Sequence, residues 1–205
     1  MNIFDFVDIE SEGLHALLEG QNPWDVTNNI ETLVINLQGS LSNEYSIENR
    51  VAIHKSAEVH PSVVITGEAL IGPGCIIAPH AYIRGGVILM EQVTIGPSCE
   101  IKSSLILSGT AIAHLNYVGN SVVGRNVNIE GGAIIANHYN ERQNKVITIM
   151  VDGQPIETGL EKFGALIGDN SRIGANAVTS PGTILPKNSV VNRLELIDQN
   201  PPSKG

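Results

Sequence analysis

Positive charge is scarce in this sequence, which has 12 Lys and Arg against 21 Asp and Glu and a formal net charge of −9. This balance argues against nucleic acid or an anionic membrane surface as a general partner. Any anionic ligand must therefore be bound by locally clustered Lys and Arg. Cysteine is scarce as well, because only Cys75 and Cys99 are present. Two cysteines suggest neither a disulfide scaffold nor a metal pair, and we expect both to pack in the core.

Long hydrophobic runs are also missing. No apolar stretch approaches the ~18 residues of a membrane span, and the N-terminus is acidic and lacks a charged-then-apolar signal. We therefore expect a cytoplasmic protein that does not bind membranes. Aromatic residues are few, with one Trp, four Tyr and three Phe, which agrees with a narrow interior.

The sequence does contain a strict six-residue repeat of aliphatic side chains. Ten positions follow it without interruption: Ile53, Val59, Ile65, Ile71, Ile77, Ile83, Leu89, Ile95, Ile101 and Leu107. A second repeat of mostly small residues has the same period: Ala57, Val63, Ala69, Cys75, Ala81, Val87, Val93, Cys99, Leu105 and Ala111. Helices repeat near 3.6 residues and ordinary strands near 2, so neither explains this period. A chain that turns a corner every six residues does explain it.

Three such faces close a triangular coil of about 18 residues, and stacked coils form a prism of parallel strands. The aliphatic side chains fill the middle of each face, and the small ones fit the corners. The pattern resumes after residue 120 and again after residue 165, which gives between six and seven coils, roughly 30 Å in length. The sequence thus predicts an all-β fold, a parallel β-helix over residues 51–195.

Two segments interrupt the repeat at some length. Residues 1–50 predict a short helix from Ser11 to Leu18 and a second from Asn22 through about Leu37, which we expect to cover the open N-terminal end of the β-helix. Residues 136–164 form an excursion in which Val146–Val151 and Gln154–Ile156 predict a β-hairpin with a two-residue turn at Asp152-Gly153. The hairpin either has no functional role or reaches a neighbouring subunit and forms the wall of its site. Residues 196–205 are expected to form a tail.

Three polar residues form the first candidate site. Arg84 and Lys102 are 18 residues apart, so they should stack on one face in successive coils, about 5 Å from each other. Two cations so close favour an anion such as phosphate between them. Between Ala113 and Val123 the spacing falls from six to five residues per face, and His114 lies there in the slot directly after the aliphatic position. One chain cannot bring all three residues together, but a groove between neighbouring prisms of a C3 trimer can.

The motifs around His114 resemble a known family. His114-Leu-Asn-Tyr117-Val-Gly-Asn-Ser, Gly124-Arg-Asn-Val-Asn128-Ile and Gly132-Ala-Ile-Ile-Ala-Asn137 are similar to the acetyltransferase half of the bifunctional N-acetylglucosamine-1-phosphate uridyltransferases. They also resemble archaeal-type sugar-1-phosphate nucleotidylyltransferase/acetyltransferase proteins. The similarity covers roughly residues 20–195 and includes a Pro-Trp-Asp linker at Pro23–Asp25. These relatives are hexapeptide-repeat proteins, so the resemblance implies a left-handed β-helix.

The resemblance also implies an activity: direct transfer of an acetyl group from acetyl-CoA to the amine of an amino-sugar phosphate such as glucosamine-1-phosphate, in a homotrimer and without a metal. His114 matches the family's general base. The residues that match its substrate site are Arg84, Lys102, Tyr117, Asn128 and Asn137, and those that match its coenzyme A groove are Gly131, Ala175 and Arg193.

The sequence departs from the family in three ways. No Gly-rich nucleotide loop precedes the linker, so we expect no nucleotidyltransferase activity. Asn120 replaces the Asp that commonly follows Tyr-Val-Gly, and His138-Tyr139 replaces the residues expected after Asn137. The family's lysine after this asparagine could be supplied by Lys145 or Lys162.

Three alternatives stay open on the sequence. The acceptor could be a nucleotide-linked amino sugar or another small amine. The chain could be a non-catalytic β-helix subunit. A γ-class carbonic anhydrase uses the same fold, but it needs three zinc-binding histidines, two of them closely spaced on one subunit. The nearest pair here, His54 and His60, lies in the first coils, and His80, His114 and His138 show no such close pairing.

Overall fold

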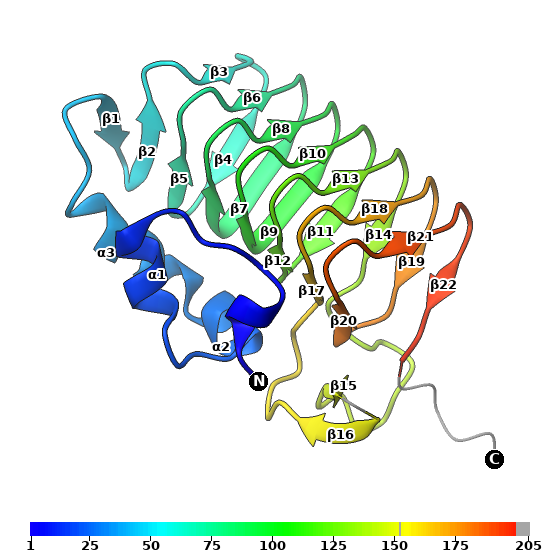
Figure 1. Ribbon diagram of the computed structural model, residues 1–205. Helices are drawn as coiled ribbons and strands as arrows, with labels where there is room; N and C mark the ends of the chain where they lie inside the picture. The colour runs from blue at the N-terminus through cyan, green and yellow to red at the C-terminus, as the bar shows by residue number, and fades with distance from the viewer. Residues whose placement is uncertain (152, 200–205) are drawn as a thin grey trace.

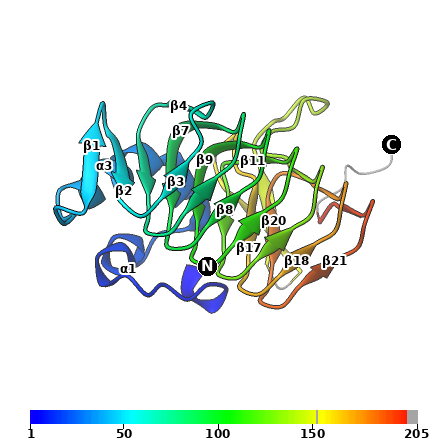
Figure 2. The same cartoon turned by 90° about the horizontal axis from the view of Figure 1, so that it is seen from above.

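The six-residue period is realised as a parallel β-helix with three faces (Figure 1). A computed structural model describes residues 1–151 and 153–199. The chain passes from the first face to the second and the third, then begins the next coil, so that each strand pairs with the equivalent strand one coil later. Figure 2 shows the successive coils as parallel rungs along the prism. The predicted β-helix is confirmed.

The strands of each face are short and stack in register. The first face consists of β2 (Val51–His54), β5 (Ala69–Ile71), the second halves of β7 (Tyr82–Leu89) and β9 (Glu100–Ile106), β12 (Val122–Val123), β17 (Ala165–Ile167) and β20 (Thr183–Leu185). The second is a seven-stranded sheet of β3 (Glu58–Val59), β6 (Ile76–Ile77), β8 (Thr94–Ile95), β10 (Ala111–Ile112), β13 (Asn128–Ile129), β18 (Arg172–Ile173) and β21 (Val190–Val191). The third consists of β4 (Val64–Thr66), the first halves of β7 (Tyr82–Leu89) and β9 (Glu100–Ile106), β11 (Tyr117–Gly119), β14 (Ile134–Ile135), β19 (Val178–Thr179) and β22 (Leu196–Ile197). The β-helix therefore continues past residue 195, and residues 200–205 of the expected tail lie outside the described part.

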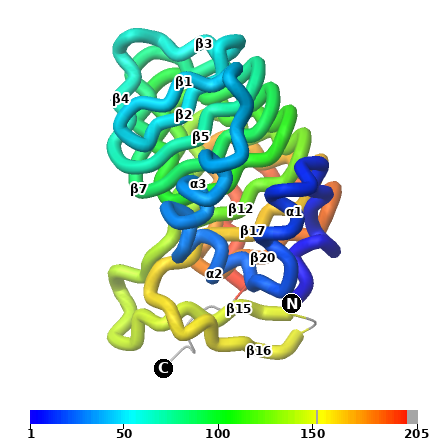
Figure 3. The backbone as a smooth tube through the Cα atoms, turned by 90° about the vertical axis from the view of Figure 1, so that its left-hand side faces the viewer, coloured from blue at the N-terminus to red at the C-terminus, as the bar shows by residue number. Residues whose placement is uncertain are grey.

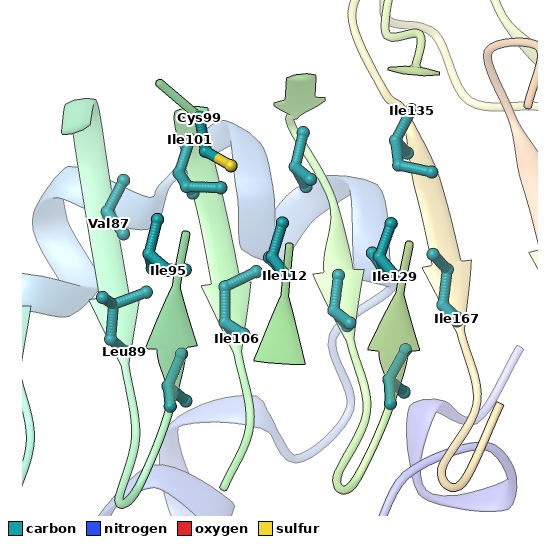
Figure 4. Packing of buried hydrophobic residues seen from close by; sticks show 14 of the residues in the cluster. Val87, Leu89, Ile95, Cys99, Ile101, Ile106, Ile112, Ile129, Ile135 and Ile167 are labelled. Carbon is teal, nitrogen blue, oxygen red and sulfur yellow. The ribbon is translucent and has the colours of Figure 1, made fainter. Parts of the chain in front are cut away.

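The interior of the prism is filled by the aliphatic ladder. Figure 4 shows Leu89, Ile95, Ile101 and other labelled side chains directed into the space between the faces. Cys75 and Cys99 belong to this core, as the sequence predicts. Burial raises the pKa of the Cys75 thiol to about 11 and also raises that of Cys99, so neither is an activated nucleophile.

The register of the ladder differs from the sequence prediction at one point. Ile106 is the inward residue (Figure 4), whereas Leu105 and Leu107 belong to the apolar cluster outside the prism. The steps from Ile101 to Ile106 and from Val118 to Val123 are each five residues. Both shortened steps fall at the corner between the third and first faces, not around His114. Ile112 is the inward residue before His114, so His114 lies two positions after the aliphatic slot rather than one.

Four short helical elements lie along the first face (Figure 3): η1 (Ile3–Asp5), α1 (Glu12–Leu18), α2 (Pro23–Asn28) and α3 (Ile30–Gln38). The Ser11 hydroxyl caps α1 by accepting from the Leu14 amide, as the sequence predicts. The second predicted helix is divided into α2 and α3 at Asn29, whose φ of −106° and ψ of 16° interrupt the helical path.

The helices cover a side of the prism and not its open end. The first face has a second apolar ladder that points outward: Leu70, Ile88, Leu105, Val122, Leu166 and Ile184. These side chains form one cluster with buried residues of the helices, among them Trp24, Leu33 and Val34, and we call it the outer cluster. The N-terminal segment reaches the end of the prism only through β1 (Tyr45–Glu48), which pairs antiparallel with β2.

The excursion contains the predicted hairpin, formed by β15 (Thr148–Val151) and β16 (Gln154–Glu157). Val151 pairs with Gln154, which leaves two residues for the turn. Of these two, Asp152 lies outside the described residues. Ile147 and Ile149 are fully buried in the outer cluster, so the hairpin packs on its own chain beside the last coils (Figure 3). Within the described residues, no helix is long and apolar enough to cross a membrane.

The contact between α3 and the first face makes a testable prediction. Gly86 has a φ of +78°, and an added Cβ would lie 2.7 Å from Cγ2 of Ile30 and 3.0 Å from the amide nitrogen of Glu31. Gly86→Ala should therefore displace α3 and lower the free energy of unfolding by about 2–3 kcal/mol, measured by urea denaturation.

The matched control is Gly13→Ala, because Gly13 lies in α1 with no atom within 4 Å of the added Cβ. This substitution should leave stability unchanged or raise it by up to ~1 kcal/mol. Similar changes in the two variants would contradict the packing described.

Candidate functional site

The third face presents an ordered polar patch. Ile83, Ile101 and Val118 point into the core, so their neighbours on the same strands point outward. These outward positions form two rows in register across β7, β9 and β11: Tyr82, Glu100 and Tyr117 in one row, and Arg84, Lys102 and Gly119 in the other. The expected stacking of Arg84 on Lys102 is therefore present in the structure.

The two cations of this patch have different partners. Arg84 donates from Nε and Nη2 to the same oxygen of Glu100, Oε1, with both distances 2.7 Å. Lys102 donates from Nζ to the amide oxygen of Asn120 at 2.9 Å. The pKa of Lys102 is lowered, first by burial and then by the positive charges of Lys162 and Arg84. Lys102 is thus a desolvated ammonium group whose hydrogen-bond partner is neutral.

Gly119 has no side chain in the second row, and two polar side chains lie over its Cα atom. A Cβ at Gly119 would lie 2.5 Å from the Tyr117 hydroxyl and 2.8 Å from Nδ2 of Asn137. Burial raises the pKa of Tyr117, so its hydroxyl is a neutral donor and acceptor at physiological pH. Tyr117 and Asn137, both predicted as substrate residues, therefore meet at the patch of Arg84 and Lys102.

Asn120 joins these groups, although the sequence marked it only as a departure from the family. It is buried, and its Oδ1 accepts from Nζ of Lys102 and, at 2.7 Å, from Nδ2 of Asn137. The backbone of Asn120 has a φ of +45° at the shortened corner, a conformation that asparagine tolerates well. Gly119, not Asn120, is in register with Lys102, so the spacing of the repeat gave no signal for this role.

Both ends of the excursion reach this cluster. The Phe163 amide donates to the Asn137 carbonyl at 3.1 Å, and the Gly164 amide donates to the Asn120 carbonyl at 2.9 Å. Lys162 directly precedes Phe163 in the chain and is close enough to lower the pKa of Lys102. Of the two lysines that the sequence offered, Lys162 is the one associated with the patch. We call the set Arg84, Glu100, Lys102, Tyr117, Gly119, Asn120, Asn137 and Lys162 the polar cluster.

His114 lies elsewhere, at the corner between the second and third faces. It heads a column of equivalent positions in successive coils: His114, Gly131, Ala175 and Arg193. Backbone bonds connect the column, since Gly132 donates to His114, Asn176 to Gly131 and Leu194 to Ala175 at 3.0–3.1 Å. The predicted base and the three predicted coenzyme A residues therefore share one edge of the prism, which we call the His114 column.

Side-chain contacts give this column its shape. His114 is exposed, and its imidazole lies over Gly131, where a Cβ would be 2.8 Å from Nε2. Arg193 is bound to Glu130 through Nε and Nη2 at 2.9 and 2.7 Å, and Glu130 also accepts from the Ala175 amide. The Arg193 hydrogen bonds and the Ala175 amide lower the pKa of Glu130.

Asn128 does not join the polar cluster. It lies exposed on β13 of the second face, in register with Arg172. Together with Arg172, Gly174 and Arg193 it lines an open groove of about 330 Å³ beside the His114 column. The structure thus places the predicted substrate residue Asn128 nearer to the predicted coenzyme A residues than to Arg84 and Lys102.

The polar cluster and the His114 column are separated within one chain. His114 lies at the corner before β11, whereas Gly119 is the last residue of that strand. The two groups lie at opposite edges of the third face. No three His, Cys, Asp or Glu side chains among residues 1–151 and 153–199 form a group that could hold a metal ion.

Comparison with known proteins places the chain in a family. The family described as "GMPPB C-terminal domain" matches residues 79–195, more than half of the sequence, and the chain belongs to this family. "Bifunctional protein GlmU" of Methanococcus maripaludis strain C5 is 36% identical over 183 residues, which cover 87% of this chain and 44% of that protein.

A second relative is the "bifunctional sugar-1-phosphate nucleotidylyltransferase/acetyltransferase" of Sulfurisphaera tokodaii, 37% identical over 166 residues, with 78% of this chain and 41% of that protein covered. The chain thus spans less than half the length of these relatives, and the resemblance seen in the sequence is confirmed. Among solved structures, the acetyltransferase domain of PglB from Neisseria gonorrhoeae in complex with acetyl coenzyme A is 15% identical with a TM-score of 0.34, covering 95% of this chain and 76% of that one.

The environment of Lys102 predicts how this site affects stability. Because the folded-state pKa lies below the ordinary 10.5, the unfolded chain binds more protons between these two values, and stability rises with pH across that window. At neutral pH the buried charge is therefore destabilising. Lys102→Met should raise the melting temperature at pH 7 by about 2 °C, and the gain should shrink as pH approaches 10.5.

Lys102→Arg is the control, because it retains the charge and should bring no gain at any pH. A loss of stability in Lys102→Met at pH 7 would show that the lysine stabilises the fold, contrary to the charge distribution described here.

Proposed function

We propose that this chain is an acetyl-CoA-dependent N-acetyltransferase that acts on an amino-sugar phosphate resembling glucosamine-1-phosphate. The observation that carries the proposal is the polar cluster, where Arg84 and Lys102 lie in register beside Tyr117 and Asn137. The names of the relatives, which include a sugar-1-phosphate nucleotidylyltransferase/acetyltransferase, agree with this assignment.

The charge of the cluster supports a phosphate subsite. Arg84, Lys102 and Lys162 outnumber the nearby carboxylates of Glu100 and Glu31, although the whole chain has a net charge of −9. Arg supplies a planar pair of donors and Lys a compact point charge, a combination that suits a phosphate group. Tyr117, Asn120 and Asn137 supply neutral donors and acceptors that suit sugar hydroxyls.

In the proposed mechanism His114 is the general base. The acceptor's ammonium group loses one proton to solvent, and His114 takes the second as the amine nitrogen attacks the thioester carbon. The new bond is C–N and the broken bond is C–S. The coenzyme thiolate leaves and is protonated by the imidazolium. Gly131 leaves space beside the imidazole, and the groove lined by Gly174 and Arg193, next to Ala175 in the chain, would hold acetyl-CoA as the second substrate.

We further propose a homotrimer in which one prism supplies the polar cluster and its neighbour supplies the His114 column. Eight large apolar residues on the second and third faces and their shared corners are exposed: Val64, Ile76, Tyr82, Leu115, Ile134, Val190, Leu194 and Leu196. Leu115 and Leu194 have positive φ values of 60° and 61°, a conformation that costs leucine about 1 kcal/mol or more. Burial of these side chains against a second copy would offset this cost.

The function is tested by release of free thiol from acetyl-CoA in the presence of glucosamine-1-phosphate. His114→Ala should lower the rate about 100-fold or more, because proton removal from the amine would lose its base. His60→Ala is the control, since His60 is an exposed histidine of the first coil that contacts Ser62 and should be dispensable. Full activity of His114→Ala would place the base elsewhere. No turnover by the unmodified protein with this or other amino-sugar acceptors would favour the non-catalytic β-helix subunit.

The shared site is tested by mixing two inactive variants. Lys102→Met and His114→Ala copies, co-expressed in equal amounts, should assemble at random into trimers. If each site takes its cations from one copy and its histidine from another, about one quarter of the sites regain both, and about a quarter of the activity returns. Light scattering should give three times the mass of the chain. A trimer without recovered activity would mean that one chain supplies both groups.

A further inference from the structure

An ion pair spans the groove beside the His114 column. Glu130 directly follows β13, and Arg193 lies two coils later, because β13, β18 and β21 pair in register. Oε1 of Glu130 accepts from Nη2 of Arg193 at 2.7 Å, and Oε2 accepts from Nε of Arg193 at 2.9 Å and from the Ala175 amide at 2.8 Å. The two side chains therefore bridge about 10 Å, or two coil spacings of about 4.8 Å, over the intervening coil of Ala175.

The bridge lies where a ligand of this groove would pass. Glu130 and Arg193 both line the groove of about 330 Å³. The His114 column beside it runs from His114 through Gly131 and Ala175 to Arg193. A ligand with one end at Arg193 and its reacting end at His114 must therefore cross the coil of Ala175, which the bridge covers. Such a ligand cannot bind the Ala175 amide or the paired edge of the guanidinium while Glu130 holds both.

The bridge is also of a kind that a ligand can open. The hydrogen bonds from Arg193 lower the pKa of Glu130, so the carboxylate is ionised at neutral pH. The side chains of Arg193 and Glu130 are 72% and 35% exposed, and exposed ion pairs contribute little to stability. A phosphate group competes well for the arginine, because it offers the guanidinium a bidentate partner of higher charge. Acetyl-CoA, the proposed donor, carries such groups.

We infer that Glu130 is a gate on the donor groove: it holds Arg193 in the free protein, and coenzyme A opens the groove when one of its phosphates replaces the carboxylate on Arg193. The inference rests on the proposed function and adds a control of that site by a residue of the chain itself. The coenzyme binds only those molecules in which the bridge is open, and this lowers its apparent affinity.

Glu130→Gln tests the gate. Its amide oxygen can still accept from the Ala175 amide, but the variant side chain has no charge to hold Arg193. Isothermal titration calorimetry with coenzyme A should give a dissociation constant about fivefold lower in this variant than in the unmodified protein. Glu195→Gln is the matched control, since Glu195 is a carboxylate beside the same groove that bonds Asn192. It should change the dissociation constant by less than about twofold.

A second background separates competition for Arg193 from the general loss of a negative charge. In Arg193→Gln the bridge is absent, so adding Glu130→Gln should tighten binding of coenzyme A no more than Glu195→Gln does. Weaker binding in Glu130→Gln alone would overturn the inference and show that Glu130 holds Arg193 in a binding orientation. Equal gains in Glu130→Gln and Glu195→Gln would overturn it as well, because net charge would then explain both. If coenzyme A binds neither the unmodified protein nor Glu130→Gln, the proposed donor fails, and the gate fails with it.

Discussion

The whole structure depends on the stacking of aliphatic side chains inside a prism that admits one layer per coil. Because Ile83, Ile101 and Val118 lie above one another in the core, their outward neighbours must also lie above one another. The same hydrophobic constraint that builds the fold therefore places Arg84 beside Lys102 without any direct attraction between them. A shift of one residue would turn the cations inward and the isoleucines outward, so the charged pair is held in place by the burial of its neighbours.

The three faces differ in what covers them, and the candidate site residues lie away from the covered face. The first face has a second apolar ladder and is covered by α2, α3 and the hairpin. In the described part of the chain no helix covers the second and third faces, and the polar cluster and the His114 column lie on the third face and at its corners. The excursion belongs to both regions: Ile147 and Ile149 anchor it in the outer cluster, while the chain beside Asn137 and Lys162 enters the polar cluster.

The period of six made the β-helix, the buried cysteines and the stacking of Arg84 on Lys102 predictable from the sequence. It could not reveal Ile106 as the inward residue, because Leu105 and Leu107 are equally apolar and the corner at Ser103 is one residue short. Nor could it show that Tyr117 and Asn137 approach over Gly119 while Asn128 lies on another face. That outcome depends on side-chain conformation at corners, where spacing along the chain no longer fixes direction.

The polar cluster also shows how function is set against stability. Lys102 is partly buried beside Arg84 and Lys162, and its direct hydrogen-bond partner is the neutral Asn120. A carboxylate at residue 120 would stabilise this lysine, but it would also neutralise the charge that a phosphate needs. The carboxylate is instead at Glu100, on Arg84 and in the neighbouring row. Among the described residues Lys102 is thus left without a carboxylate partner, and the destabilisation that results is the cost of a positive charge that stays available to an anionic ligand.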